Sequence, residues 1–205
     1  KAIDLNKKGL SVAQKLPNEN IPLLVLLYRN LAISYLSLSN HIKVEENLQL
    51  ALQAIEKSTE TYNYYLSIIY DVLGAMYNKI GDFQKSYYYY QKTLAVYQVE
   101  HIGVAHINNL LAKLAYFLND YSKSIAYNQT ALEILQKNQV QKHSVFPSIY
   151  FCLSRCCFSQ GNEDKALLLL QKALDATILN YGNGHILESK MYGQFGQYYM
   201  DMGEL

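Results

Sequence analysis

The sequence repeats itself about every 42 residues, and this self-similarity restricts the fold more than any other feature of the chain. Gap-free alignment places five segments in the same register, with starts at Leu31, Leu73, Leu111, Leu153 and Phe195. The offsets between these starts are 42, 38, 42 and 42 residues, and Leu10 precedes Leu52 by a further 42. A fixed period of this length is typical of proteins in which one small supersecondary unit stacks on the next.

Each unit reads as two helices joined by a short turn. Gly81-Asp82, Asn119-Asp120 and Gly161-Asn162 interrupt the hydrophobic pattern in the middle of a unit, where a helix would end and another would begin. Pro22 and Pro147 stand near the expected start of a first helix, where a missing backbone N–H does little harm. The pattern therefore predicts an all-α fold, a solenoid of antiparallel helix pairs.

The units resemble the tetratricopeptide (TPR) repeat, whose signature runs L-G-x2-Y and then A-x3-F. Leu73, Gly74 and Tyr77 match the first part, and Ala166 with Leu170 matches the second. The resemblance implies a right-handed superhelical solenoid, here of a 42-residue type, in which the small residue at position two allows the helices of a pair to approach closely. The small residues that align with Gly74 in the other repeats are Ala32, Ala112, Ser154 and Gly196.

The repeat alignment also predicts where the repeats lie. We expect the second helix of a partial repeat, four TPR units and the first helix of another partial repeat over residues 1–16, 22–57, 64–98, 102–137, 145–179 and 186–205. Because both ends fall inside a repeat, we expect the chain to be a piece of a longer array. Self-association through exposed end repeats would follow, with Phe195, Tyr198 and Tyr199 left half-covered.

Four consecutive tyrosines, Tyr87 to Tyr90, occupy a second helix, and the equivalent stretch of a later repeat is four leucines. A second helix packs between two first helices, so apolar residues on nearly every side indicate packing rather than a special tyrosine function. At the fourth position the third repeat has Asn128 instead of an aromatic residue. We expect Asn128→Tyr or Phe to stabilise the fold, by on the order of a kcal/mol.

Composition and motifs exclude several classes of function. The net charge is +1 without a dense Lys/Arg run, so no nucleic-acid partner is predicted, and no apolar run is long enough to span a membrane. The sequence contains no known catalytic or nucleotide-binding motif, so no enzyme, cofactor or metal site is predicted. The cysteines Cys152, Cys156 and Cys157 are interpreted as structural thiols of a cytoplasmic protein.

By the resemblance, the first helices line a concave groove in which TPR proteins hold extended or helical peptides. The groove positions lie six and three residues before, and one and four residues after, the small residue. The candidate peptide-binding residues are Arg29, Asp71, Asn78, His106, Asn109, Lys113, Tyr116, Phe151, Arg155, Phe158, Lys190 and Gln197. Cations dominate this set, so we expect an acidic peptide, with Arg155 between Phe151 and Phe158 and with Asn109 holding peptide backbone.

Three functions remain open. The chain resembles the peptide-sensing TPR domains of bacterial regulators, which suggests a sensing or interaction module of a larger signalling protein. The stretch Tyr181-Gly182-x-x-His185 resembles the linker of kinesin light chains and of protease-associated repeats, which suggests a cargo or assembly adaptor. The third possibility is a structural spacer.

Overall fold

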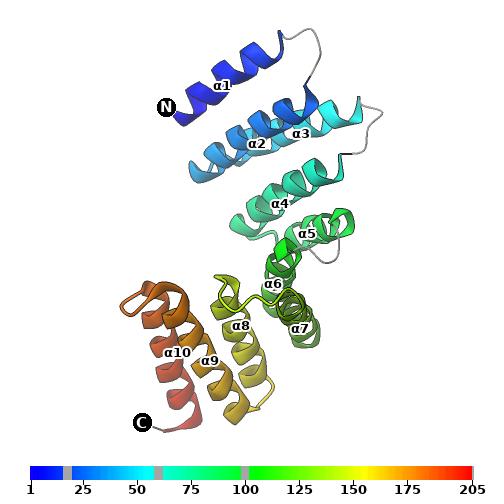
Figure 1. Ribbon diagram of the computed structural model, residues 1–205. Helices are drawn as coiled ribbons and strands as arrows, with labels where there is room; N and C mark the ends of the chain where they lie inside the picture. The colour runs from blue at the N-terminus through cyan, green and yellow to red at the C-terminus, as the bar shows by residue number, and fades with distance from the viewer. Residues whose placement is uncertain (16–19, 58–61, 98–101, 205) are drawn as a thin grey trace. The chain divides into compact units, whose positions relative to one another are not determined.

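The computed structural model describes residues 1–15, 20–57, 62–97 and 102–204. Over these residues the chain is all-helical, as predicted (Figure 1). The helices are α1 (Ala2–Ala13), α2 (Ile21–Ser37), α3 (His41–Glu56), α4 (Asn63–Lys79), α5 (Phe83–Val96), α6 (Ile102–Phe117), α7 (Tyr121–Lys137), α8 (Val145–Ser159), α9 (Glu163–Tyr181) and α10 (Ile186–Met202). None of the described helices is long and apolar enough to cross a membrane.

Short turns join α2 to α3, α4 to α5, α6 to α7 and α8 to α9. We propose that each of these pairs is one repeat with the boundaries predicted above; the boundaries at residues 16, 98 and 205 lie outside the described residues.

The turns within the pairs share one design. A residue with a positive φ angle ends the first helix, for example Gly81 (φ 83°), Asn119 (φ 61°) and Gly161 (φ 76°). The next residue is Asn or Asp, and its side-chain oxygen accepts a hydrogen bond from the backbone N–H three residues later, as Asp82 does from Lys85 and Asp120 from Lys123. These positions match the turns predicted from the sequence.

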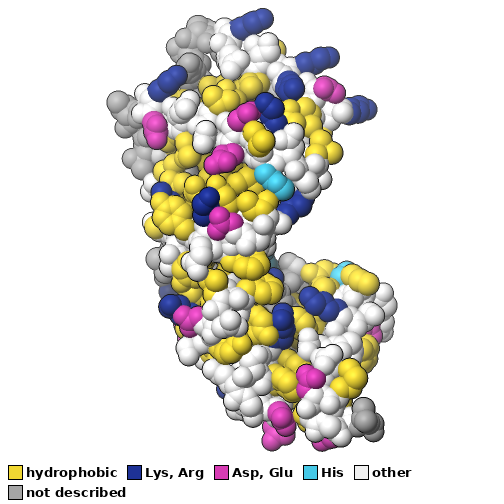
Figure 2. Space-filling model, turned by 180° about the vertical axis from the view of Figure 1, so that it is seen from behind, with side chains coloured by type: hydrophobic (Ala, Val, Ile, Leu, Met, Phe, Trp, Pro, Cys, Tyr) yellow, Lys and Arg dark blue, Asp and Glu magenta, His cyan; other side chains and the backbone are white. Residues whose placement is uncertain are grey.

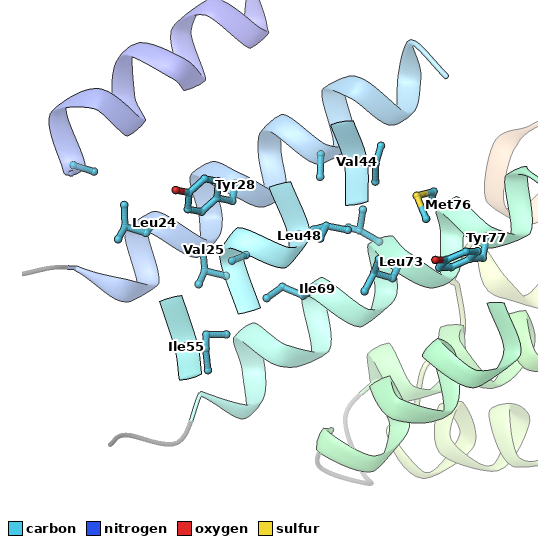
Figure 3. Close-up of a cluster of buried hydrophobic side chains, with 14 residues drawn as sticks. Leu24, Val25, Tyr28, Val44, Leu48, Ile55, Ile69, Leu73, Met76 and Tyr77 are labelled. Atoms are coloured by element: carbon cyan, nitrogen blue, oxygen red, sulfur yellow. The ribbon is translucent and has the colours of Figure 1, made fainter. Parts of the chain in front are cut away.

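The chain divides into two compact units, one of α1 to α5 and one of α6 to α10. In the first unit the core lies between α2, α3 and α4, where Val25, Val44, Leu48 and Ile69 are fully buried (Figure 3). Val44 and Leu48 are four residues apart in α3, about one helical turn, so they lie on the same face of that helix.

The second unit has several smaller clusters. Leu170, Ala173, Met191 and Tyr198 pack between α9 and α10, and Leu135 and Ile149 pack between α7 and α8. Tyr198 is buried and stacks on Phe158, with ring centroids 4.0 Å apart. The expectation that Tyr198 would be left half-covered is therefore wrong, because α8 supplies a flat ring against which it packs.

The tyrosine run of α5 is a packing feature. Tyr90 is buried, Tyr87 and Tyr89 are half-buried, and Tyr88 is exposed. Tyr89 stacks on Tyr77 of α4 with centroids 5.4 Å apart, and the Lys92 ammonium lies 4.9 Å from the Tyr88 ring centroid. The rings thus cover several sides of α5, from the buried Tyr90 to the exposed Tyr88.

The connection before α10 contains the Tyr-Gly-x-x-His stretch and has a local structural role. The Tyr181 and His185 rings stack with centroids 4.3 Å apart, and Gly182 and Gly184 both have φ near 80°. The His185 ring nitrogen accepts a hydrogen bond from the Leu187 backbone N–H and so caps α10. These contacts explain the motif through chain geometry alone.

Figure 2 shows one face of the molecule, on which basic and acidic side chains are interspersed among hydrophobic and neutral ones. The mixture of charges on this face agrees with the net charge of +1.

Candidate functional site

A cavity of about 370 Å³ opens between α6, α8 and α10 of the second unit. α6 and α8 are the first helices of their pairs, and α10 is predicted to hold the same place in the next repeat, so the cavity lies on the face that the repeat register assigned to the groove. Its walls are mostly apolar or aromatic, with a few polar groups. The lining residues are Lys113, Tyr116, Phe117, Ser144, Pro147, Ser148, Phe151, Cys152, Arg155, Leu187, Lys190 and Met191. We call this the α6–α8–α10 pocket.

Three cations converge on the pocket, and two of them are held by aromatic rings. The Arg155 guanidinium lies 4.2 Å from the centroid of Tyr116 and 5.9 Å from that of Phe151. The Lys190 ammonium lies 4.6 Å from the Phe151 centroid. Contacts at these distances are attractive because the face of an aromatic ring is negative, and they fix the direction of the charged groups.

Lys113 is the most deeply placed of the three cations. Burial lowers the pKa of its ammonium, the neighbouring Cys152 thiol opposes this shift, and the positive charge of Lys190 adds to it. No Asp or Glu lines the pocket, and none of the three cations makes an ion pair within the described part of the chain. A half-buried cation without a counter-ion is costly, so an anion in this pocket would be bound favourably.

Five of the predicted groove residues, Lys113, Tyr116, Phe151, Arg155 and Lys190, therefore come together in one pocket. Phe158 does not line this pocket. It stacks on Tyr198 and, together with Arg155 and Tyr116, lines a smaller neighbouring cavity of about 270 Å³. Within the α6–α8–α10 pocket, the rings nearest to Arg155 are those of Tyr116 and Phe151.

The structure corrects the expectation for Asn109. Its side chain is 1% exposed. Its amide nitrogen donates to Asn128 Oδ1 at 2.9 Å, and its Oδ1 accepts from the Ser148 hydroxyl at 2.7 Å. Asn109 and Asn128 thus form a buried polar link between α6, α7 and α8, and Asn109 is not presented to a peptide.

The remaining candidates of the second unit lie outside the pocket. His106 is exposed on α6. Gln197 is exposed on α10, and its amide donates to Asp201 Oδ1 at 2.7 Å.

Three candidates lie in the first unit. Arg29 of α2 is half-buried, and its Nη1 donates to Asn30 Oδ1 at 3.5 Å. Asp71 of α4 is half-buried near Tyr90, where burial first and the Asp71 charge second raise the pKa of that tyrosine. Asn78 is exposed near the end of α4.

A thiol cluster lies at the base of the pocket. The Cys156 thiol donates to the Ser124 hydroxyl at 3.1 Å, and Ser124 Oγ lies 3.4 Å from Cys152 Sγ. The hydrogen bond from Cys156 lowers the pKa of Cys152; burial opposes the shift, whereas Ser124, Asn128 and the charge of Lys113 add to it. All three cysteines are free and buried, but Cys152 also lines the pocket, which the interpretation as purely structural thiols missed.

Sequence reasoning also missed the other lining residues outside the predicted set. Phe117 and Cys152 each follow directly after a predicted groove position, so they flank the predicted stripe. Ser148 lies six residues before Ser154, on the stripe itself, but was not among the residues selected from it. The predicted set contains only the positions at the middle of the groove and omits the residues at its sides. Including the residue that follows each groove position would have found Phe117 and Cys152.

Known proteins resemble this chain in sequence over part of its length. Residues 64–137, which include α4 to α7, match the model of the tetratricopeptide repeat. The clustered mitochondria protein homolog of Xenopus tropicalis is 31% identical over 90 residues, which are 44% of this chain and 7% of that protein. The chain thus matches only a small part of this curated relative.

Solved structures show the same fold over more of the chain. BtubC (BKLC) from P. vanneervenii has a TM-score of 0.83 at 21% identity, over 99% of this chain and 84% of that one. A putative kinesin light chain with TPR-like repeats from Podosopora anserina has a TM-score of 0.68 at 15% identity, over 86% and 85%. The apo form of RapI has a TM-score of 0.72 at 15% identity, over 98% and 77%. The chain therefore carries tetratricopeptide repeats, matched directly over residues 64–137, and has the all-helical fold of TPR proteins.

Proposed function

We propose that this TPR domain is a non-catalytic interaction module that binds an acidic peptide or protein segment in the α6–α8–α10 pocket. The observation that carries the proposal is the convergence of Lys113, Arg155 and Lys190 on an aromatic cavity that no acidic residue lines. The proposed segment presents a carboxylate next to a bulky apolar side chain.

The geometry supports this choice of ligand. A guanidinium binds a carboxylate through two parallel hydrogen bonds, and the stacking of Arg155 on Tyr116 reduces the entropy lost when those bonds form. The apolar neighbour of the carboxylate would enter between Phe151, Leu187 and Met191, where burial of its surface adds affinity.

We further propose that the domain serves as the sensing or interaction module of a larger bacterial regulatory protein. A cargo or assembly adaptor would use the same pocket chemistry, and the likeness to a putative kinesin light chain is one of fold alone. The domains encoded beside these repeats in the full-length gene would separate a regulator from an adaptor or a spacer.

A peptide array followed by titration calorimetry tests the proposal. We expect the bound peptides to carry an acidic residue beside a large apolar one. Arg155→Glu should weaken their binding by roughly 30-fold, about 2 kcal/mol, since like charges would then face each other. Lys172→Glu, the same charge change at an exposed position of α9, is the matched control and should leave affinity nearly unchanged. Neutral or basic peptides among the hits, or undiminished binding by Arg155→Glu, would contradict the proposed site.

A further inference from the structure

Cys152 combines burial in the fold with a place on the wall of a cavity. It is 5% exposed, and it lies on α8 and lines the same pocket as Phe151 and the three cations. A reagent would therefore reach this thiol through the α6–α8–α10 pocket. Reagents that enter an aromatic pocket with three cations are favoured when they are small and negatively charged.

Four polar groups surround the sulfur of Cys152. Ser124 and Cys156 form a hydrogen-bonded chain that ends at this sulfur, and Lys113 supplies a positive charge. The fourth group is the amide of Asn128, which is fully buried and whose Nδ2 has no hydrogen-bond partner among the described residues. Because its N–H could donate to a negatively charged sulfur, Asn128 lowers the pKa of the Cys152 thiol. An otherwise unpartnered buried donor becomes satisfied when the sulfur carries negative charge.

We propose that Cys152 is a modification site, a reactive thiol that undergoes exchange with small anionic disulfides. In this step the Cys152 thiolate attacks one sulfur of the disulfide RS–SR. A Cys152–SR bond forms, the RS–SR bond breaks, and the other half leaves as RS⁻, which takes up the proton that Cys152 released. The disulfide is thus the oxidant, and no further co-reactant is needed.

The other two thiols differ from Cys152. The hydrogen bond to Cys152 and burial raise the pKa of Cys156, and burial raises the pKa of Cys157. Neither of them lines the pocket. Because the thiolate is the nucleophile, the exchange should be selective for Cys152.

Modification of Cys152 would also control peptide binding in the pocket. The added group would occupy the space beside Arg155 and Lys113, so a modified domain would bind acidic peptides more weakly. This consequence rests on the proposed function, whereas the reactivity of Cys152 does not.

Three disulfides of similar size and different charge provide the test: anionic dithiodiglycolate, neutral hydroxyethyl disulfide and cationic cystamine. The folded chain is treated with each, adducts are counted by intact mass and located by peptide mapping, and each rate is divided by that of free cysteine. We expect a single adduct on Cys152, with the normalised rate for the anion at least tenfold above that for the cation. Added salt should reduce this ratio.

Two variants test whether the preference for the anionic disulfide comes from the pocket. Arg155→Gln should lower the anion-to-cation ratio by several-fold, while Lys172→Gln on the exposed side of α9 should leave it unchanged. The rate for the anion should rise with pH around a midpoint below the value of about 8.5 for a free cysteine. Titratable, charged and polar groups face Cys152 and its pocket from α6, α7, α8 with the preceding Ser144, and α10. Among the described residues these are Lys113, Tyr116, Ser124, Asn128, Ser144, Ser148, Arg155, Cys156 and Lys190.

Absence of a Cys152 adduct in the folded chain would overturn the inference, as would equal normalised rates for the three disulfides. Such a result with acidic peptides still bound would leave the proposed function intact. If the adduct forms and peptide binding is unchanged, the control of the pocket is refuted while the reactivity stands.

Discussion

Gly74 and Tyr90 form a size-matched pair that a single methyl group should disrupt. A Cβ atom added to Gly74 would lie 2.7 Å from the nearest ring carbon of Tyr90. Tyr90 is 3% exposed, so its ring has little space into which it could move. In the repeat alignment, alanine at the small position goes with a smaller residue opposite, as in Ala32 with Leu48.

The expected magnitude follows from two opposing effects of Gly74→Ala. Overpacking of a well-filled site costs about 1–3 kcal/mol. Alanine also favours the helical backbone over glycine by roughly 0.5–1 kcal/mol, which offsets part of this loss. We therefore expect Gly74→Ala to lower the free energy of unfolding by about 0.5–2 kcal/mol.

Gly196 provides the matched control, since it holds the same repeat position in α10 and an added Cβ would meet no atom within 4 Å. Gly196→Ala should raise stability by up to about 1 kcal/mol. Urea denaturation followed by far-ultraviolet circular dichroism measures both. In a Tyr90→Leu background, Gly74→Ala should become neutral or stabilising. If Gly74→Ala alone stabilises the fold as Gly196→Ala does, the proposed steric conflict with Tyr90 is refuted.

Three further outcomes are expected. Asn128→Tyr should destabilise the fold by roughly 2–4 kcal/mol in the same urea assay, contrary to the sequence-based expectation, because the ring overfills a buried position and leaves the Asn109 amide unpaired; a stability gain would contradict this. Lys113→Met should raise the urea midpoint and weaken acidic-peptide binding in calorimetry, since it removes a half-buried cation without a counter-ion. Loss of both stability and binding would show a packing role instead. Burial first of all raises the pKa of Tyr77 and Tyr198 to about 12, so their contribution to stability should be complete below pH 10 and be lost as the pH rises from 10 to 12. Urea midpoints across this range should fall less steeply for Tyr198→Phe than for the unmodified chain, and equal slopes would contradict the assignment.

The fold could be read from the sequence because its determinants are local and repeated. Several features recur in more than one unit: the period, the turn residues such as Gly81-Asp82, and a small residue at the position of Gly74. The assignment of helices in one unit therefore supports the assignment in the next. The repeat register likewise identified Lys113, Arg155 and Lys190 as members of one face, and they line one pocket.

Other features depend on contacts between units that no single repeat contains. Asn109 occupies a groove position by register, but its hydrogen bonds to Asn128 and Ser148 draw it into the core. Phe158 turns to Tyr198 of a helix forty residues away along the chain. The role of Cys152 depends on Ser124 of the preceding repeat, and sequence spacing carries no signal for that pairing.

The position of a bound acidic peptide is the most direct test of the central claim, that the α6–α8–α10 pocket is the working surface. A crystal structure of the chain with the tightest peptide from the array would show it. We expect a peptide carboxylate within about 2.7–2.9 Å of the Arg155 guanidinium nitrogens, with the neighbouring apolar side chain among Phe151, Leu187 and Met191. A peptide seated elsewhere, or one whose carboxylate points into solvent while Arg155 remains stacked on Tyr116 without a ligand, would contradict the account.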